Sequence, residues 1–250
     1  MDEQSAIKKY LVRNDIPHME INAALIDMDG VLYDSMKNHT AAWYRMVTEL
    51  GIKCSRDEFY LYEGMTGAAT INLLFNRAFG HPATREQMKE LYHKKTVYFS
   101  ELPKPEPMPG AGEMLNILKQ NNITPVLVTG SGQSSLIDRL NSDYPGMFMP
   151  QNKITAHDVK HGKPNPEPYL KGLERVKSQP YQAIVIENAP LGVAAGHASG
   201  CFTIGITTGP VPESKLWENG SDIVYKSMPE FACSLPGLLK EMNKTVMPCI

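Results

Sequence analysis

The fold is decided by the stretch Ala23-Ala24-Leu25-Ile26-Asp27-Met28-Asp29-Gly30, in which four apolar residues end abruptly at two aspartates and a glycine. An apolar run of this length, closed by a polar turn that contains glycine, is typical of a buried parallel strand rather than of a helix. We therefore predict a strand over residues 23–26, with Asp27 and Asp29 directly after its carboxyl end.

Four more apolar runs have the same form, and helical patterns separate them. The expected strands are residues 123–128, 183–186, 202–206 and 223–225, and the expected helices are residues 111–120, 133–140, 166–176 and 192–199. Strands that alternate with helices predict an α/β fold with a doubly wound, Rossmann-like parallel sheet. We expect the last strand at an edge, and Pro125 near the start of its strand because proline cannot donate to a sheet ladder.

One long segment breaks the alternation. Residues 35–102 contain no convincing strand, and the helical pattern at 37–50, the capping boxes at 55–58 and 84–87 and the pattern at 70–79 predict helices instead. The chain returns through the proline-rich residues 103–109, a stiff linker. The sequence thus predicts a core domain of residues 1–34 and 109–250 with an inserted all-helical cap domain, residues 35–108. Such an insert can close over the strand ends as a lid.

Composition narrows the kind of partner. The 250 residues are 42% hydrophobic, enough for one core domain with an insert, and the formal net charge is -2. Nothing here indicates a nucleic-acid or membrane partner, and no run approaches the length of a membrane span. The N-terminus lacks a signal-peptide pattern, and the four cysteines form no paired spacing. We expect a cytoplasmic monomer that binds a small phosphorylated molecule.

Polar side chains gather where the predicted strands end. They are Asp27, Asp29, Thr129, Ser131, Glu187 and Asn188, joined by Lys163 in the extended loop Gly162-Lys163-Pro164. Ligands of open α/β sheets bind at the carboxyl ends of the strands, so these residues are expected to share one site. Carboxylates, an amide, hydroxyls and a lysine suit a magnesium ion and a phosphoryl group.

The residue types suggest separate roles. Asp27 is expected to attack phosphorus and form an aspartyl-phosphate, and Asp29 to act as the acid/base that protonates the leaving oxygen and then takes a proton from water. Asp27, the backbone carbonyl of Asp29 and Asn188 are the expected Mg²⁺ ligands. Glu187 is a further candidate that contacts the metal directly or acts through Lys163.

The remaining phosphoryl oxygens need hydrogen-bond donors. Lys163, the Thr129 hydroxyl and backbone N–H groups of the turn that follows, at Gly130 and Ser131, are expected to bind them. This turn is neither a Walker loop nor a dinucleotide fingerprint, since the residues that complete those motifs are missing.

Taken in order, four short motifs carry a family resemblance. Asp27-Met-Asp-Gly-Val31, Val128-Thr-Gly-Ser131, Gly162-Lys-Pro164 and Ile186-Glu-Asn188 resemble the four motifs of the haloacid dehalogenase superfamily. The insert after the first motif resembles the helical cap of the β-phosphoglucomutase-like subgroup. The resemblance implies a Mg²⁺-dependent enzyme with a capped core, and the second aspartate implies phosphoryl chemistry, because the dehalogenases and phosphonatases of the superfamily lack it.

Two departures from the mutases of that subgroup bear on the substrate. In the first cap loop, Glu63 falls where the mutase motif has a lysine and Gly67 where it has an arginine. A carboxylate near a phosphate dianion is repulsive, and losing the arginine removes a bidentate phosphate clamp. Asn188 stands where most relatives have aspartate, which leaves a bound metal less neutralised and favours a strongly anionic ligand.

These departures resemble a bacterial inorganic pyrophosphatase branch of the subgroup. The expected cap residues at the substrate are Glu63 and Thr66 of the first loop, Lys95, which matches a subgroup lysine facing the site, and His39 at the cap entry. The leading hypothesis is hydrolysis of pyrophosphate or a small phosphate ester. The alternatives are a β-phosphoglucomutase that interconverts β-glucose 1-phosphate and glucose 6-phosphate, and a non-catalytic phosphate-binding protein.

Overall fold

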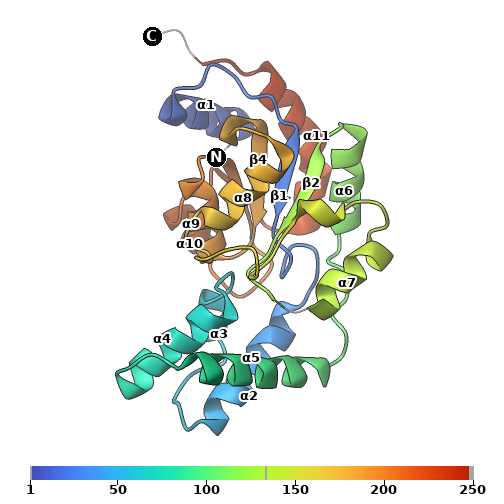
Figure 1. Ribbon diagram of the computed structural model, residues 1–250. Coiled ribbons are helices and arrows are strands. Elements are labelled where there is room, and N and C mark those ends of the chain that lie inside the picture. Colours follow the sequence, from blue (N-terminus) through green and yellow to red (C-terminus); the bar gives the residue numbers. More distant parts are fainter. Residues whose placement is uncertain (1, 133, 248–250) are drawn as a thin grey trace.

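A computed structural model describes residues 2–132 and 134–247 (Figure 1). Its centre is a six-stranded parallel sheet with the strand order β3-β2-β1-β4-β5-β6. The strands are β1 Ala23–Ile26, β2 Thr124–Val128, β3 Lys153–Ile154, β4 Ala183–Glu187, β5 Phe202–Ile206 and β6 Ile223–Tyr225. The predicted doubly wound α/β fold is confirmed, and the order reverses between β1 and β4, where such sheets bind ligands.

Helices cover both faces of the sheet. They are α1 Glu3–Asn14, α6 Ala111–Gln120, α7 Ser134–Asp143, α8 Glu167–Val176, α9 Pro190–Ala198, α10 Glu213–Glu218 and α11 Met228–Lys244, with short 3₁₀ turns at Pro150–Asn152 and Pro180–Gln182. In β1, Ala24 and Ile26 pack into the core cluster that includes residues of α1, α6 and α11, whereas Ala23 and Leu25 pack into the cluster with residues of α8 and α9. Both faces of β1 are therefore buried, which explains its continuous apolar run.

The sequence-based expectations for the sheet hold except at one edge. The predicted edge strand, β6, is an edge, but the other edge strand, β3, was not expected. It has only two residues, too few for a recognisable pattern, and it pairs with Leu127 and Val128 alone. Pro125 lies near the start of β2, as predicted, beyond the reach of β3. Gln133, the expected first residue of α7, lies outside the described residues.

Four helices form the inserted region: α2 Met36–Glu49, α3 Glu58–Leu61, α4 Gly67–Phe79 and α5 Arg85–Ser100. They pack around their own apolar cluster and lie across the lower end of the sheet in Figure 1. The capping box predicted at Thr84 and Gln87 is formed. The one predicted at Ser55 is only half formed, since the Glu58 carboxylate pairs with Arg77, so the helix begins at Glu58.

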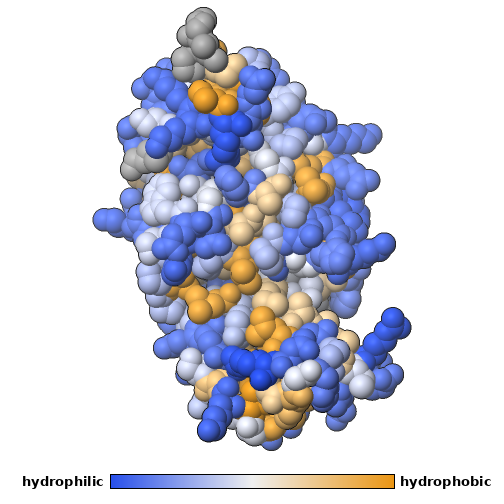
Figure 2. All heavy atoms as spheres, turned by 90° about the vertical axis from the view of Figure 1, so that its left-hand side faces the viewer, coloured by the Kyte–Doolittle hydropathy of each residue, from blue (hydrophilic) through white to orange (hydrophobic). Residues whose placement is uncertain are grey.

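The surface is mostly polar. Figure 2 shows one face, on which polar side chains surround several separate apolar patches, the lower ones over the cap. Within residues 2–132 and 134–247, no helix has both the length and the apolar character needed to cross a membrane.

Candidate active site

Asp27 lies immediately after β1, at the buried centre of the sheet. Its backbone N–H donates to the Ile186 carbonyl at 3.1 Å, which continues the β1–β4 pairing to this residue. The side chain is only 3% exposed, and the Lys163 ammonium lies 2.5 Å from Oδ1. The sheet thus places Asp27 Oδ1 in direct contact with the Lys163 ammonium.

All three protons of the Lys163 ammonium have acceptors. Nζ donates to Asp27 Oδ1 at 2.5 Å, to Glu187 Oε1 at 2.5 Å and to the Val128 carbonyl at 3.0 Å. Burial lowers the pKa of Lys163, but the two carboxylates outweigh it and the pKa is raised above its usual value. Lys163 therefore stays charged, and it must exchange one of these acceptors to contact a phosphate.

Glu187 is a hydrogen-bond hub that is fully buried. Oε1 accepts from Lys163 and from the Tyr169 hydroxyl at 2.6 Å, and Oε2 accepts from the backbone N–H groups of Asn188 at 3.1 Å and Ala189 at 3.3 Å. Both oxygens are therefore engaged within the protein. Of the two roles expected for Glu187, this arrangement favours action through Lys163 over a direct contact with a metal.

Asn188 and Glu63 join the core to the cap. The Asn188 amide Nδ2 donates to Glu63 Oε1 at 2.8 Å. Asn188 Oδ1 is then left buried with no hydrogen-bond partner among the described residues. Glu63 itself is buried, and burial, followed by the charge of Asp27, raises its pKa well above the usual value. Glu63 faces the site rather than solvent.

A second chain of contacts begins at Asp29. Its Oδ1 accepts from the Ser35 hydroxyl at 2.5 Å and from His39 Nε2 at 3.0 Å, while Lys95 Nζ lies 2.6 Å from His39 Nδ1. Burial acts to raise the pKa of Asp29, but His39 and Ser35 outweigh it and the pKa is lowered. Burial lowers the pKa of Lys95 to about 7, and burial together with Lys95 lowers that of His39. A neutral His39 thus donates to Asp29 and accepts from Lys95.

The turn after β2 forms another wall of the site. Thr129 is held by its backbone N–H to the Ile154 carbonyl, and its hydroxyl accepts from the Ser131 N–H at 3.0 Å. The next amide, of Gly132, donates at 3.1 Å to the Tyr92 hydroxyl, which comes from the cap. Some amides of this predicted phosphate-binding turn thus already have acceptors.

The cap loop approaches this turn very closely. A Cβ added at Gly130 would lie 2.3 Å from the Gly64 carbonyl oxygen, and one at Gly162 would lie 2.8 Å from the Thr66 methyl group. Thr66 also caps α4 through its hydroxyl, which accepts from Ala69, and it does not line the cavity described next. The cap is closed on the core, with backbone against backbone.

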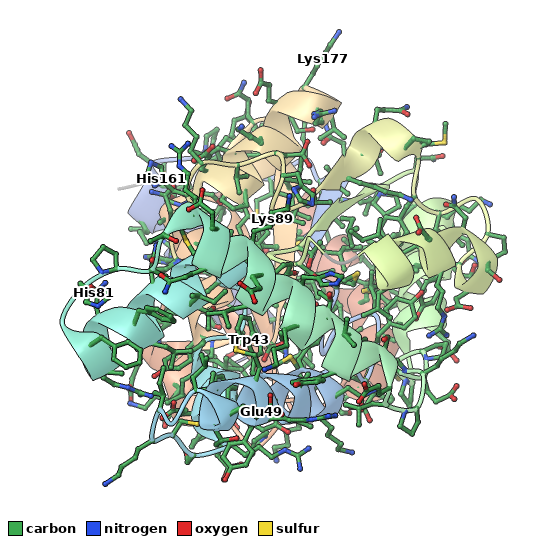
Figure 3. All side chains as sticks on the ribbon, turned by 60° about the horizontal axis from the view of Figure 1, so that its bottom comes forward. Trp43, Glu49, His81, Lys89, His161 and Lys177 are labelled. Atoms are coloured by element: carbon green, nitrogen blue, oxygen red, sulfur yellow. The ribbon has the colours of Figure 1, made fainter. Side chains whose placement is uncertain are left out.

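Beneath the closed cap lies a small cavity of about 60 Å³. Most predicted site residues line it, namely Asp27, Asp29, His39, Glu63, Lys95, Thr129, Gly130 and Ser131. Its roof is aromatic: Figure 3 places Trp43 between α2 and α5, and the Lys95 ammonium lies 5.5 Å from the Trp43 ring. At roughly 10–15 Å³ for each water, this space is enough for a few water molecules.

Several residues of this arrangement escaped sequence reasoning. Ser35 bonds Asp29, Tyr169 bonds Glu187, and Tyr92 reaches Gly132 from the cap. Ser35 lies soon after Asp29 and its hydroxyl could have suggested it. Tyr169 and Tyr92 sit inside ordinary helical patterns, where an aromatic residue is normally part of the core, so no pattern distinguished them.

Two buried aspartates at the reversal point of a parallel sheet, under a helical cap, define a capped α/β protein whose acidic site lies where such sheets bind their ligands. The haloacid dehalogenase-like hydrolase family matches residues 21–200 of this chain, and the chain belongs to that family.

Curated relatives include both hydrolases and a mutase. Glycerol-1-phosphate phosphohydrolase 2 of Saccharomyces cerevisiae is 32% identical over 84% of this chain and 83% of its own length. Beta-phosphoglucomutase of Bacillus subtilis is 26% identical over 76% of this chain and 84% of its own. A solved structure from Bacteroides vulgatus, described as a candidate beta-phosphoglucomutase, shares 46% identity and a TM-score of 0.93 over 97% of this chain and 98% of that one. The predicted superfamily and subgroup are confirmed.

Proposed function

We propose that this protein is a Mg²⁺-dependent phosphohydrolase that acts through an aspartyl-phosphate at Asp27 on inorganic pyrophosphate or a small phosphate ester. The choice of substrate rests on Glu63, which is buried and hydrogen-bonded to Asn188. Glu63 stands at the position where the mutase motif has a lysine. We also propose that residues 1–34 and 109–250 form the core domain and that residues 35–108 form the cap domain.

The first step is attack by Asp27. One carboxylate oxygen forms a bond to phosphorus as the bond to the leaving oxygen breaks, and the electron pair departs with the leaving group. The buried Lys163 keeps its positive charge beside Asp27, so it stabilises the phosphoryl oxygens once it exchanges the Val128 carbonyl or a carboxylate for one of them.

The residues present fit a magnesium ion. Asn188 Oδ1 is a buried oxygen that lacks a hydrogen-bond partner within the described residues, and a hard cation would supply the missing interaction. In the part of the chain that the structure describes, no group of three or more His, Cys, Asp or Glu side chains is placed to hold a metal. We propose Asp27, the Asp29 backbone carbonyl and Asn188 as the ligands, and bound Mg²⁺ would supply charge neutralisation between the nucleophile and the phosphoryl oxygens.

The protonation state of Asp29 favours a substrate whose leaving group can depart without a proton. Its lowered pKa keeps it ionised near neutral pH, ready to accept the proton of the water that hydrolyses the aspartyl-phosphate. An alkoxide leaving from a sugar ester needs a proton in the first step, whereas phosphate leaving from pyrophosphate does not depend on one to the same extent. The His39–Lys95 chain could still supply a proton through Nε2 when an ester is the substrate.

The closed cavity and its charges support a compact substrate. A cavity of about 60 Å³ under the closed cap favours a compact substrate over a sugar bisphosphate. Gly67 carries no side chain that could hold the distal phosphate of a sugar bisphosphate, and the Tyr92 ring fills the space beside it. Glu63 lies buried where the mutase motif has a lysine, so the cation that would hold that phosphate is missing. Lys95 is a cap residue whose amine lines the cavity, and we propose that it contacts the far phosphate of pyrophosphate.

A substrate panel with Mg²⁺ tests the proposal. Pyrophosphate, common sugar phosphates and β-glucose 1-phosphate are offered separately, and released phosphate and glucose 6-phosphate are measured. We expect phosphate release from pyrophosphate, or from one small ester, to exceed that from every sugar phosphate. Formation of glucose 6-phosphate without free phosphate would establish the mutase instead, and inactivity on all compounds would leave only phosphate binding.

A further inference from the structure

The two linkers that join the cap to the core run together at the base of the cap. Tyr33 of the outgoing linker forms an antiparallel bridge with Pro107 of the return linker, and the Asp34 N–H donates to the Glu106 carbonyl at 2.9 Å. The linkers therefore form a short two-stranded ribbon. Pro105 is the first residue on the cap side of that ribbon, so a change in cap orientation must move it.

Helix α7 contacts both linkers from the core side (Figure 1). Arg139 Nη1 donates to the Pro105 carbonyl at 2.9 Å, and Nη2 lies 2.9 Å from Asp143 Oδ2. The same carboxylate oxygen accepts from the Tyr33 hydroxyl at 3.0 Å, and the Arg139 guanidinium lies 5.3 Å from the centroid of the Tyr33 ring. We name Arg139, Asp143 and Tyr33 the hinge clamp.

The position of α7 gives the hinge clamp a link to the site. The helix begins at Ser134, shortly after the turn whose Thr129, Gly130 and Ser131 line the cavity. The N-terminal end of α7 therefore lies close in sequence to the cavity wall, and its C-terminal half contacts both linkers. Tyr144, the residue after α7, adds a further contact, its hydroxyl donating to the Leu32 carbonyl at 2.5 Å.

We propose that the hinge clamp holds the cap in its closed orientation and that Arg139 is a positioning residue for the reaction, an inference that rests on the proposed function. Through these two contacts, the Arg139 guanidinium joins Pro105, on the cap side of the ribbon, to Asp143 of the core helix α7. A ligand that binds only the closed form has an apparent dissociation constant equal to its intrinsic constant divided by the closed fraction. Loosening the hinge clamp should therefore weaken substrate binding and leave the chemistry of the closed complex unchanged.

The chain offers a matched control for Arg139. Arg175, on α8, also bridges a backbone carbonyl, of Gln151, and an aspartate, Asp158, each at 3.4 Å, but it touches neither linker. Arg139→Ala and Arg175→Ala thus remove the same chemical group and the same kinds of partner. Arg139→Lys keeps the charge and can reach Asp143 or the Pro105 carbonyl, so it should restore part of the function.

Cap orientation is measured without relying on turnover. Spin labels on Lys89→Cys of α5 and Lys119→Cys of α6, both exposed positions, report the cap–core distance by pulsed electron resonance after Cys54, Cys233 and Cys249 are replaced by serine. With Mg²⁺ and inorganic phosphate as the probe, the parent and Arg175→Ala should give one narrow distance. Arg139→Ala should add a second, longer distance, and Arg139→Lys should reduce its share.

Kinetics supply the second measurement. On the best substrate of the panel, Arg139→Ala should raise KM about fivefold, as expected if the closed fraction falls to about one fifth, with kcat within about twofold of the parent. An Arg139→Ala distance distribution identical to that of Arg175→Ala would overturn the hinge clamp. Inactivity of the parent on every compound would instead defeat the proposed function, and the spin-label distances would still decide on the clamp.

Discussion

The carboxylate of Glu63, from the cap, accepts a hydrogen bond at 2.8 Å from the side-chain amide of Asn188, from the end of β4. The two residues belong to different parts of the fold, the cap and the core, so the contact requires the closed cap. Glu63 lines the cavity, and Asn188 Oδ1 is left without a partner in the described residues, so the pair presents one buried oxygen for a cation.

Glu63→Ala should broaden the substrate range. Removing this side chain enlarges the cavity that it lines, so turnover of bulkier esters relative to pyrophosphate should rise on the order of tenfold. The ratio of kcat/KM values for the two substrates is the measurement. Glu63→Gln keeps the size and the acceptor for Asn188 and should change the ratio much less; a ratio that stays constant in Glu63→Ala would remove Glu63 from substrate selection.

Asp27→Asn should abolish turnover. The amide is a poor nucleophile, and a loss of at least about 10³-fold in kcat is expected, as for the nucleophiles of other covalent enzymes. The substitution preserves the shape of a buried group beside Lys163, so we expect the fold to stay intact. Circular dichroism and thermal unfolding check this. Activity near that of the parent would show that another residue attacks phosphorus.

Gly130→Ala should obstruct cap closure. Its Cβ would lie 2.3 Å from the Gly64 carbonyl, a backbone atom that cannot turn away, so the loops must separate and KM should rise about tenfold or more. Gly112→Ala is the control, since a Cβ there meets nothing within 4 Å and the residue lies in α6. That variant should be more stable by about 0.5–1 kcal/mol and keep its KM. Equal KM values for the two variants would contradict the close approach.

Much of the fold follows from sequence because its strands are buried on both faces. A continuous apolar run as short as residues 183–186, closed by polar residues, is typical of such a strand, and the polar residues at the strand ends must meet at one edge of a parallel sheet. The two-residue β3 is different: it exists because Lys153 and Ile154 find a partner in β2, and nothing in their own pattern requires a strand.

The candidate site divides in the same way. Asp27, Lys163 and Asn188 are recognisable because each follows a strand or a proline-stiffened loop in a short motif. The contacts of Tyr92 and Arg139 depend on how the cap docks and where α7 ends, which are properties of tertiary packing. A helical tyrosine or arginine looks the same in sequence whether it reaches a functional loop or solvent.

The buried Lys95 predicts how stability depends on pH. Burial lowers its pKa from 10.5 to about 7, so between these values the unfolded chain binds a proton that the folded protein does not. Stability due to this group therefore rises with pH over that range, since unfolding is then coupled to proton uptake. Comparing pH 7.5 with pH 9.5, the free energy of unfolding of the parent relative to Lys95→Met should increase by about 2–3 kcal/mol.

Lys94→Met is the matched control for this experiment. Lys94 is the neighbouring residue on α5, and its hydrogen bond to Glu49 raises its pKa, so it is protonated in both states over the same pH range. The parent and Lys94→Met should therefore show the same dependence on pH, whereas Lys95→Met should show a flatter one. Urea unfolding gives a free energy for each protein at each of the two pH values, and the same change with pH in all three proteins would mean that Lys95 remains charged beside His39 in the folded state.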